Sequence, residues 1–275
     1  MRSLEWLVWG MTRGVALLAI ALFSGVVGYI FMEAWRSFSP GLIAPDGVLW
    51  SPMAGTVLLV ILSVILALPV GVAAGIYLGV YATGRTRMFL SFLFEMLASI
   101  PSILIGLFGF ALILILHRWW GGALPSLALA AVSVAILIVP YLIKATELGI
   151  TEASREHIAA AYALGATTEQ VVWRIQLPAA RTHILKGLLL AIARAAEDTA
   201  VILLTGAVAS YGVPRSLWEP FEALPFYIYT TTAEYGSPAE LGTVFVAAAL
   251  LVVLAGMFVM IASTVECKRA TRNTP

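Results

Sequence analysis

Three charged side chains stand close together in an otherwise apolar stretch of this sequence: Arg194, Glu197 and Asp198. The acids follow the arginine by three and four residues, so in a helix both carboxylates lie on its face, within reach of an ion pair. A guanidinium offers a rigid fork of donors that matches the oxygens of a phosphate or another oxyanion. The group therefore predicts a contact or gate for an anion, with the carboxylates as counter-charges. A pair that only neutralises itself and fixes the rotation of the helix stays open as the alternative.

The composition of the chain predicts that these charges lie inside a membrane. Of the 275 residues, 61% are hydrophobic and 11% are charged, whereas soluble domains are roughly 45–50% apolar and about 25% charged. With 16 basic and 15 acidic side chains, the chain carries no excess of basic charge with which to bind nucleic acid. The single cysteine and the scattered histidines form no metal-binding set, and no bound cofactor is expected.

Six apolar stretches are each long enough to form a helix that crosses a bilayer, for which roughly 20 residues are needed. The sequence therefore predicts an all-α integral membrane protein with six transmembrane helices in a single domain, residues 1–275. Arg194 comes ten residues into the fifth stretch, about 15 Å along a helix and close to the midplane of a bilayer about 30 Å thick. Glu95, in the third stretch, is a further charge that could meet the Arg194 group across the bundle. The expected spans are residues 14–35, 53–81, 88–116, 124–143, 184–208 and 240–264.

The lysines and arginines are distributed unevenly between the two sides of these spans. Twelve of the 16 lie on the side that also holds both chain ends, three lie on the opposite side, and Arg194 falls within a span. Because basic loops stay in the cytoplasm, both termini are expected to be cytoplasmic.

Glycines mark one face of the second stretch. Gly71, Gly75 and Gly79 are four residues apart, so they share a helical stripe along which a neighbouring backbone can approach closely. This predicts a helix-packing face, whose neighbour could belong to this chain or to a partner subunit. In the third stretch, Pro101 predicts a kink.

The polar segment 144–183, between the fourth and fifth stretches, predicts two short helices. Gly165 suits the left-handed end of the first helix, and Thr167 with Gln170 forms a capping box for the second. A helical hairpin that projects from a membrane bundle is suited to inserting into a groove on a soluble partner. A helical loop that lies on the membrane surface is the alternative.

This segment carries a spaced set of residues: Ala159-Ala160-Ala161, then Gly165, Ile175 and Leu177-Pro178. The spacing resembles the EAA loop of ABC-importer permeases, in which Glu-Ala-Ala leads to Gly and then to Ile-x-Leu-Pro. Ala159 stands where that pattern has Glu, and Glu156, one helical turn earlier, is hypothesised to take its role. The resemblance implies a type I ABC-importer permease fold, with cytoplasmic coupling helices that dock a separate ATPase. Glu156 and the matching residues are the expected coupling residues.

A second set of residues surrounds the buried arginine. Ala193-Arg194-Ala195 followed by Asp198-Thr199-Ala200 resembles the Arg-Ala-x-Gly-Glu-Thr stretch of phosphate-specific ABC permeases. Glu197 replaces the Gly of that pattern and Asp198 replaces its Glu. Residues 101–109 and 224–229 also resemble this subfamily, particularly its A-type subunit. The candidate substrate path comprises Arg194, Glu197, Asp198, Thr199 and Glu95.

The resemblance implies a heteromeric phosphate importer of the prokaryotic cytoplasmic (inner) membrane. The expected partners are a second, C-type permease subunit, a dimer of ABC ATPases, a periplasmic or extracellular phosphate-binding protein, inorganic phosphate and the lipid bilayer. The chain has no Gly-x-x-x-x-Gly-Lys-Ser/Thr loop to hold nucleotide, so ATP with Mg is expected to be used by the partner ATPase. A permease for sulfate, molybdate or tungstate is the main alternative. An intramembrane enzyme is a weaker one, because no histidine lies beside the carboxylates.

Overall fold

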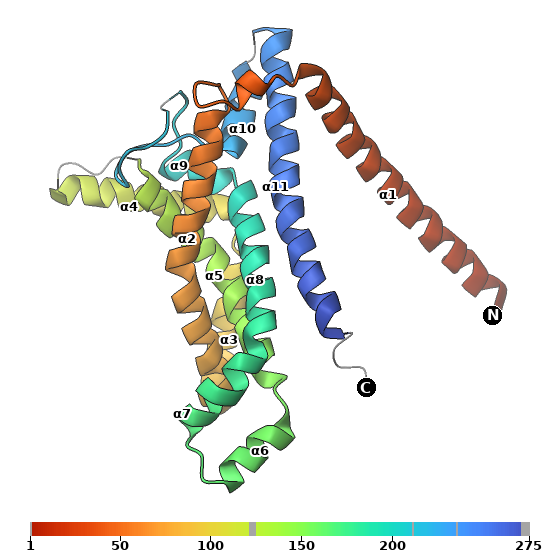
Figure 1. Cartoon of the computed structure of the whole chain (residues 1–275), viewed down its shortest axis with the longest axis vertical. Helices are drawn as coiled ribbons and strands as arrows, with labels where there is room; N and C mark the ends of the chain where they lie inside the picture. The colour runs from red at the N-terminus through yellow and green to blue at the C-terminus, as the bar shows by residue number, and fades with distance from the viewer. Residues whose placement is uncertain (1, 121–124, 211, 235, 271–275) are drawn as a thin grey trace.

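The computed structural model describes residues 2–120, 125–210, 212–234 and 236–270, which are mostly helical (Figure 1). Within these residues the only β-type pairing is a single bridge between Ala207 and Phe221. The prediction of an all-α fold is therefore confirmed. In chain order the elements are α1 (Arg2–Ser37), η1 (Pro40–Leu42), α2 (Trp50–Ile76), η2 (Tyr77–Tyr81), α3 (Gly84–Ser99), α4 (Ser102–Trp120), α5 (Leu127–Thr151), α6 (Arg155–Ala163), α7 (Thr168–Val171), η3 (Val172–Gln176), α8 (Leu177–Glu197), α9 (Ala200–Thr205), α10 (Leu224–Glu234) and α11 (Pro238–Ala270).

Helices α2, α5 and α8 form the core of the bundle and run side by side (Figure 1). The contact surfaces are rich in alanine, which lets the helix backbones approach closely. Larger apolar side chains from α2, α5 and α9 fill the remaining space of the same buried cluster. The fully buried alanines include Ala130 and Ala131 on α5 and Ala191, Ala195 and Ala196 on α8.

The glycine stripe of α2 lies against α5 of the same chain. At each position an added Cβ would collide with a side chain of α5: Gly71 with Leu142, Gly75 with Thr146 and Gly79 with Ile150. The three α5 residues are four apart, like the glycines, so one stripe follows the other along the contact. The packing neighbour of the glycine face is therefore α5.

Two of the six expected spans are interrupted. The third breaks at Ile100, whose extended backbone (ψ 127°) precedes Pro101 and separates α3 from α4, because a residue before proline disfavours the helical conformation. The fifth breaks at Asp198, which is also extended (ψ 117°), between α8 and α9. Among the described residues, five helices rather than six are long and apolar enough to cross a membrane: Trp9–Ser37, Trp50–Tyr81, Ser102–Trp119, Leu127–Thr151 and Pro238–Met257.

The fourth span differs from its expected bounds. Helix α5 continues to Thr151, past the expected end at residue 143, and so includes the first part of the segment that was expected to be a loop. Leu124, the expected start, lies outside the described residues.

Two features mark the opposite ends of the bundle (Figure 1). At one end α6, α7 and η3 project as a helical hairpin, residues 155–176, called the hairpin below. At the other end residues 206–210 and 212–223, called the cap segment, lie over the start of α5. There Leu127 N–H donates to Glu219 O at 2.9 Å and Ala128 N–H donates to Leu217 O at 2.8 Å. These bonds satisfy amides that an unassisted helix start would leave unpaired.

Candidate functional site

The site predicted around Arg194 lies where α8 ends and α9 begins. Arg194 Nη2 is 2.9 Å from Asp198 Oδ2, and Arg194 Nη1 is 3.4 Å from Glu197 Oε1. The Asp198 side chain is 2% exposed, that of Arg194 28% and that of Glu197 52%. The structure thus brings the three charges together, with Asp198 as the buried partner of the arginine and Glu197 as the exposed one.

Asp198 also connects the two sides of the helix break. Its Oδ1 accepts a hydrogen bond from Val201 N–H at 2.9 Å, while its Oδ2 faces Arg194 on α8. A carboxylate is favourable at the start of a helix, where backbone amides are unpaired. One side chain therefore holds the arginine of α8 and the first turn of α9. The sequence predicted the ion pair but not the break that it spans.

Helix α9 packs closely on α4. An added Cβ at Gly106 would lie 2.9 Å from Ala200 O and 3.1 Å from Val201 Cα. At Gly109 it would collide with Ser133 Oγ of α5 and with Thr205 of α9. These glycines belong to the 101–109 motif, in which the sequence predicted a kink at Pro101 but no packing role for the glycines. They place α4 directly against the helix that begins at the Arg194 site.

The two remaining candidate path residues, Thr199 and Glu95, take no part in the described ion pairs of Arg194. Thr199, half-buried, occupies the position before α9, and its side chain makes no capping bond. Glu95, on α3, lines a small cavity of about 170 Å³ together with Lys144 and Glu147 of α5. The structure therefore places Glu95 beside a second group of charges, between α3 and α5.

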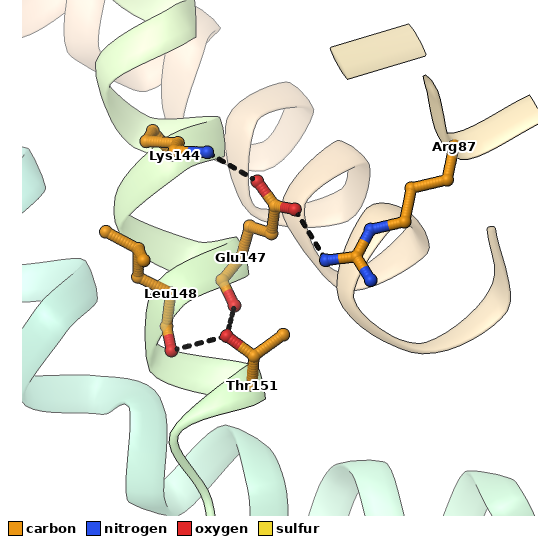
Figure 2. A network of polar contacts seen from close by, with 5 residues as sticks. All are labelled: Arg87, Lys144, Glu147, Leu148 and Thr151. Carbon is orange, nitrogen blue, oxygen red and sulfur yellow. Dashed lines mark hydrogen bonds and ion pairs between the residues drawn. The ribbon is translucent and has the colours of Figure 1, made fainter. Parts of the chain in front are cut away.

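This second group was missed in the sequence and centres on Glu147 (Figure 2). Glu147 Oε1 is 3.0 Å from Arg87 Nη2, and its Oε2 is 3.3 Å from Lys144 Nζ. The Glu147 side chain is only 9% exposed. The three-residue spacing of Lys144 and Glu147 was a detectable signal, but residue 144 was expected to begin a loop, and Arg87 is 60 residues from Glu147.

The hairpin has the local structure that its sequence predicts. Gly165 adopts a left-handed backbone conformation (φ +81°) after α6. The capping box of Thr167 and Gln170 is present at the start of α7. Both predictions are confirmed.

The expected coupling residues spread along the hairpin and into α8. Helix α6 buries none of its residues, so Glu156, Ala159 and Ala160 are exposed and Ala161 is half-buried. Ile175 and Leu177 are half-buried and Pro178 is exposed, where η3 passes into α8. Tyr162 and Leu164 remain 45% and 89% exposed, which leaves apolar side chains uncovered at the tip of the hairpin.

The cap segment contains a buried acid, Glu222, which is 6% exposed. Burial raises the pKa of its carboxyl above the ordinary value, and a hydrogen bond from Ser210 N–H at 3.4 Å acts in the opposite direction. Ser210 has a positive φ of 57°, which is uncommon for a residue other than glycine.

The arrangement of the helices is that of a known class of membrane transporter. A chain of the MetNI methionine ABC transporter in an inward-facing conformation superposes with a TM-score of 0.60 at 17% identity, over 83% of this chain and 99% of that one. Residues 71–269 match the family described as binding-protein-dependent transport system inner membrane component. The chain belongs to this family. It is a transmembrane permease subunit of an ABC transporter, in which ATP hydrolysis is carried out by another subunit, and it is not an enzyme.

The chain is also similar to permeases whose names state the substance that they transport. The chain is 30% identical over 234 residues to the phosphate transport system permease protein PstA of Yersinia pestis, covering 82% of this chain and 72% of that protein. It is 27% identical over 201 residues to a probable PstA of Methanocaldococcus jannaschii, covering 73% and 69%. It is 27% identical over 245 residues to the PstC permease of Pasteurella multocida, covering 76% and 75%. The match spans only 52% of the length of two mycobacterial PstA relatives.

Proposed function

We propose that the chain is the A-type permease subunit of an ATP-driven importer of inorganic phosphate. The names of the PstA relatives support this cargo. The observation that carries the proposal is the Arg194 guanidinium, partly exposed and held at 2.9 Å by a buried carboxylate at a break in an apolar helix. A fork of donors at such a break suits a tetrahedral oxyanion.

The two acids have different parts in this proposal. Glu197 is half-exposed and 3.4 Å from Arg194, so an entering phosphate can displace it at little cost. Asp198 is buried and also holds the start of α9, so it keeps the guanidinium oriented while the phosphate is bound. The hydroxyl of Thr199, on the same break, is a further donor to the anion. Because the site competes with its own counter-charges, it binds weakly enough to release.

The hairpin is proposed to dock the dimer of ABC ATPases, which binds ATP with Mg. Its exposed apolar tip, formed by Tyr162 and Leu164, suits a groove on a soluble partner. ATP-driven closure would draw this hairpin toward that of a second, C-type permease, and the central path would alternate between the two sides of the membrane. The similarity to a PstC permease supports a related second subunit.

The orientation follows from the docking of the hairpin, which places its end of the bundle in the cytoplasm. In Figure 1, the end of α1 and the start of α11 lie near the end of the bundle that carries the cap segment, and both helices extend from there in the direction of the hairpin. The chain ends are therefore proposed to be cytoplasmic. The cap segment then faces the periplasmic or extracellular phosphate-binding protein.

Uptake of radiolabelled phosphate into proteoliposomes tests the cargo. The vesicles hold this chain with its partner permease, ATPase and binding protein, and are challenged with excess arsenate, sulfate or molybdate. We expect ATP-dependent uptake that only arsenate blocks. Transport of another anion in place of phosphate would overturn the assignment of the cargo while leaving the permease class in place.

The Arg194→Gln variant tests the site. We expect the complex to assemble and uptake to fall by at least about 100-fold, because the charged fork is lost. Arg36→Gln is the matched control, since Arg36 also pairs with an acid three residues away, Glu33, at 2.8 Å but lies on α1. Uptake at the wild-type rate in Arg194→Gln would remove Arg194 from the path.

The role of Glu156 is tested separately. If it replaces the glutamate of the EAA loop, Glu156→Ala lowers uptake and phosphate-stimulated ATP hydrolysis together. Glu169→Ala, an exposed acid in the first turn of α7, is the control. Unchanged coupling in Glu156→Ala would assign the contact to the shape of the hairpin.

A further inference from the structure

Helix α3 is joined to the bundle by one buried carboxylate. Arg87, in the first turn of α3, pairs with one oxygen of Glu147, while Lys144 pairs with the other (Figure 2). Both cations are about half exposed, at 45% and 57%, whereas Glu147 is 9% exposed. Breaking a buried ion pair costs far more than breaking a surface pair. This contact is therefore the strongest polar link between α3 and α5 that the described residues provide.

The apolar packing of α3 is slight by comparison. None of its 16 residues is buried, and only Leu90 and Phe94 lean on the small cluster formed by Leu78, Ala82 and Ile143. Its two ends are interrupted: Gly84 begins it with a positive φ of 52°, and the Ile100–Pro101 break ends it. A helix with interrupted ends and little buried surface depends on its ion pair for a fixed position.

The position of Glu147 connects two functional regions. It lies one turn before the end of α5, where Thr151 Oγ1 donates to Glu147 O at 3.0 Å (Figure 2). Only residues 152–154 separate α5 from α6 of the hairpin. On the other side, α3 leads through the Pro101 break into α4, which packs on α9 beside the Arg194 site. The ion pair thus lies between the hairpin and the helix that carries the proposed anion site.

We propose that Glu147 is a positioning residue that joins α3 to α5, so that motion of the hairpin reaches α4 and the Arg194 site. This inference rests on the proposed function, because it takes the hairpin to be the part that the ATPase moves. Arg87 supplies the link to α3, and Lys144 keeps the carboxylate paired within α5. When the hairpin moves the end of α5, the ion pair carries α3 with it, and α4 follows through the Pro101 joint.

The test is Arg87→Gln in the reconstituted transporter. Lys144 still neutralises Glu147 in this variant, so the chain is expected to fold and to assemble. We expect phosphate uptake to fall about tenfold while basal ATP hydrolysis stays within about twofold of wild type, because the motion is no longer transmitted. Glu147→Gln removes the pair with Lys144 as well as the pair with Arg87, so uptake falls at least as far. The double variant is no worse than Glu147→Gln alone, since both changes remove the same link to α3.

A distance measurement distinguishes an ion pair that holds α3 in a fixed position on α5 during transport from one that only stabilises the fold. Nitroxide labels are placed at Met96 on α3 and Leu148 on α5, which are both exposed, after Cys267→Ser has removed the native cysteine. We expect one narrow distance distribution with and without trapped ATP in the otherwise wild-type chain, and a broad distribution in Arg87→Gln. Arg85→Gln, an exposed arginine in the same turn of α3, is the matched control and keeps the narrow distribution.

The outcomes separate this inference from the proposed function. Normal uptake and a narrow distribution in Arg87→Gln would overturn the joint even if the wild type carries phosphate. Absence of phosphate uptake in the wild type would overturn the proposed cargo, and the label distances would still decide whether the ion pair joins α3 to α5.

Discussion

The break between α8 and α9 differs from the hairpin in how far the chain itself covers and pairs the side chains. At the break, the charges are paired within the chain, and Asp198 is buried with a partner on each oxygen. At the hairpin, α6 buries no residue and Leu164 is 89% exposed. Mutations at a site whose side chains are already paired within the chain should lower the stability of the chain. Mutations at a surface left uncovered should lower the affinity for the partner that covers it.

A large effect on stability is expected at the break between α8 and α9. Asp198→Ala leaves Arg194 with only its exposed partner and removes the hydrogen bond to Val201 N–H. We expect the free energy of unfolding to fall by about 2 kcal/mol, combining a lost helix cap with a broken buried pair. Chemical denaturation of the purified chain in detergent, followed by circular dichroism, measures it.

Glu197→Ala is the control for this prediction. Its side chain is 52% exposed and its distance to Arg194 is longer, so the loss should stay below about 0.5 kcal/mol. Equal losses in the two variants would show that the buried carboxylate does not hold the break together.

The hairpin should give the opposite result. Leu164→Asp adds a charge to a side chain that is exposed in the isolated chain, so the free energy of unfolding should change by less than about 0.5 kcal/mol. The affinity for the ATPase should fall by about tenfold or more, because a charge would enter a buried apolar contact. Co-purification of the ATPase with the permease and denaturation of the permease alone measure the two effects.

Val172→Asp sharpens the same comparison. Val172 is 2% exposed at the base of the hairpin, so this charge should destabilise the chain itself. Loss of stability in Leu164→Asp as well would mean that the tip of the hairpin is packed within the chain and not held ready for a partner.

The difference between the two regions also explains what the sequence could predict. The pairing of Arg194 with its acids, the left-handed Gly165 and the capping box of Thr167 all depend on residues within a few positions of one another. Such local contacts follow from helix geometry, and each is present in the structure.

Features set by distant residues were not predictable in the same way. The Glu147–Arg87 pair joins residues 60 positions apart, and no spacing rule relates them. The break at Asp198 has no proline or glycine to signal it. It forms where the carboxylate accepts a local bond from Val201 N–H and where α9 packs on the glycines of α4. The packing on α4 is a tertiary contact, which no local pattern signals. The fifth span was therefore predicted as continuous, although its charged residues were identified.

The cap segment adds a third case to this comparison. Its acid Glu222 is buried like Asp198, but its described contacts include no cation. Because burial raises the pKa of its carboxyl, the neutral form is favoured in the folded chain, and ionisation weakens the fold. The stability contributed by the neutral form is complete below the ordinary pKa of about 4.5 and is lost as the pH rises through the raised value. Glu222→Gln mimics the neutral form and keeps an oxygen that can accept from Ser210 N–H.

The smallest of the expected effects follows from the raised pKa of Glu222. Thermal unfolding in detergent should give equal melting temperatures for wild type and Glu222→Gln near pH 4, and a higher one for the variant at neutral pH. Glu219→Gln is the control, because Glu219 accepts a bond from Arg215 N–H at 2.7 Å in an exposed part of the cap segment. A variant that melts lower than wild type at neutral pH would mean that Glu222 is ionised and paired in the folded chain. The cap segment would then be held by charge, as the break is, and not by burial of a neutral acid.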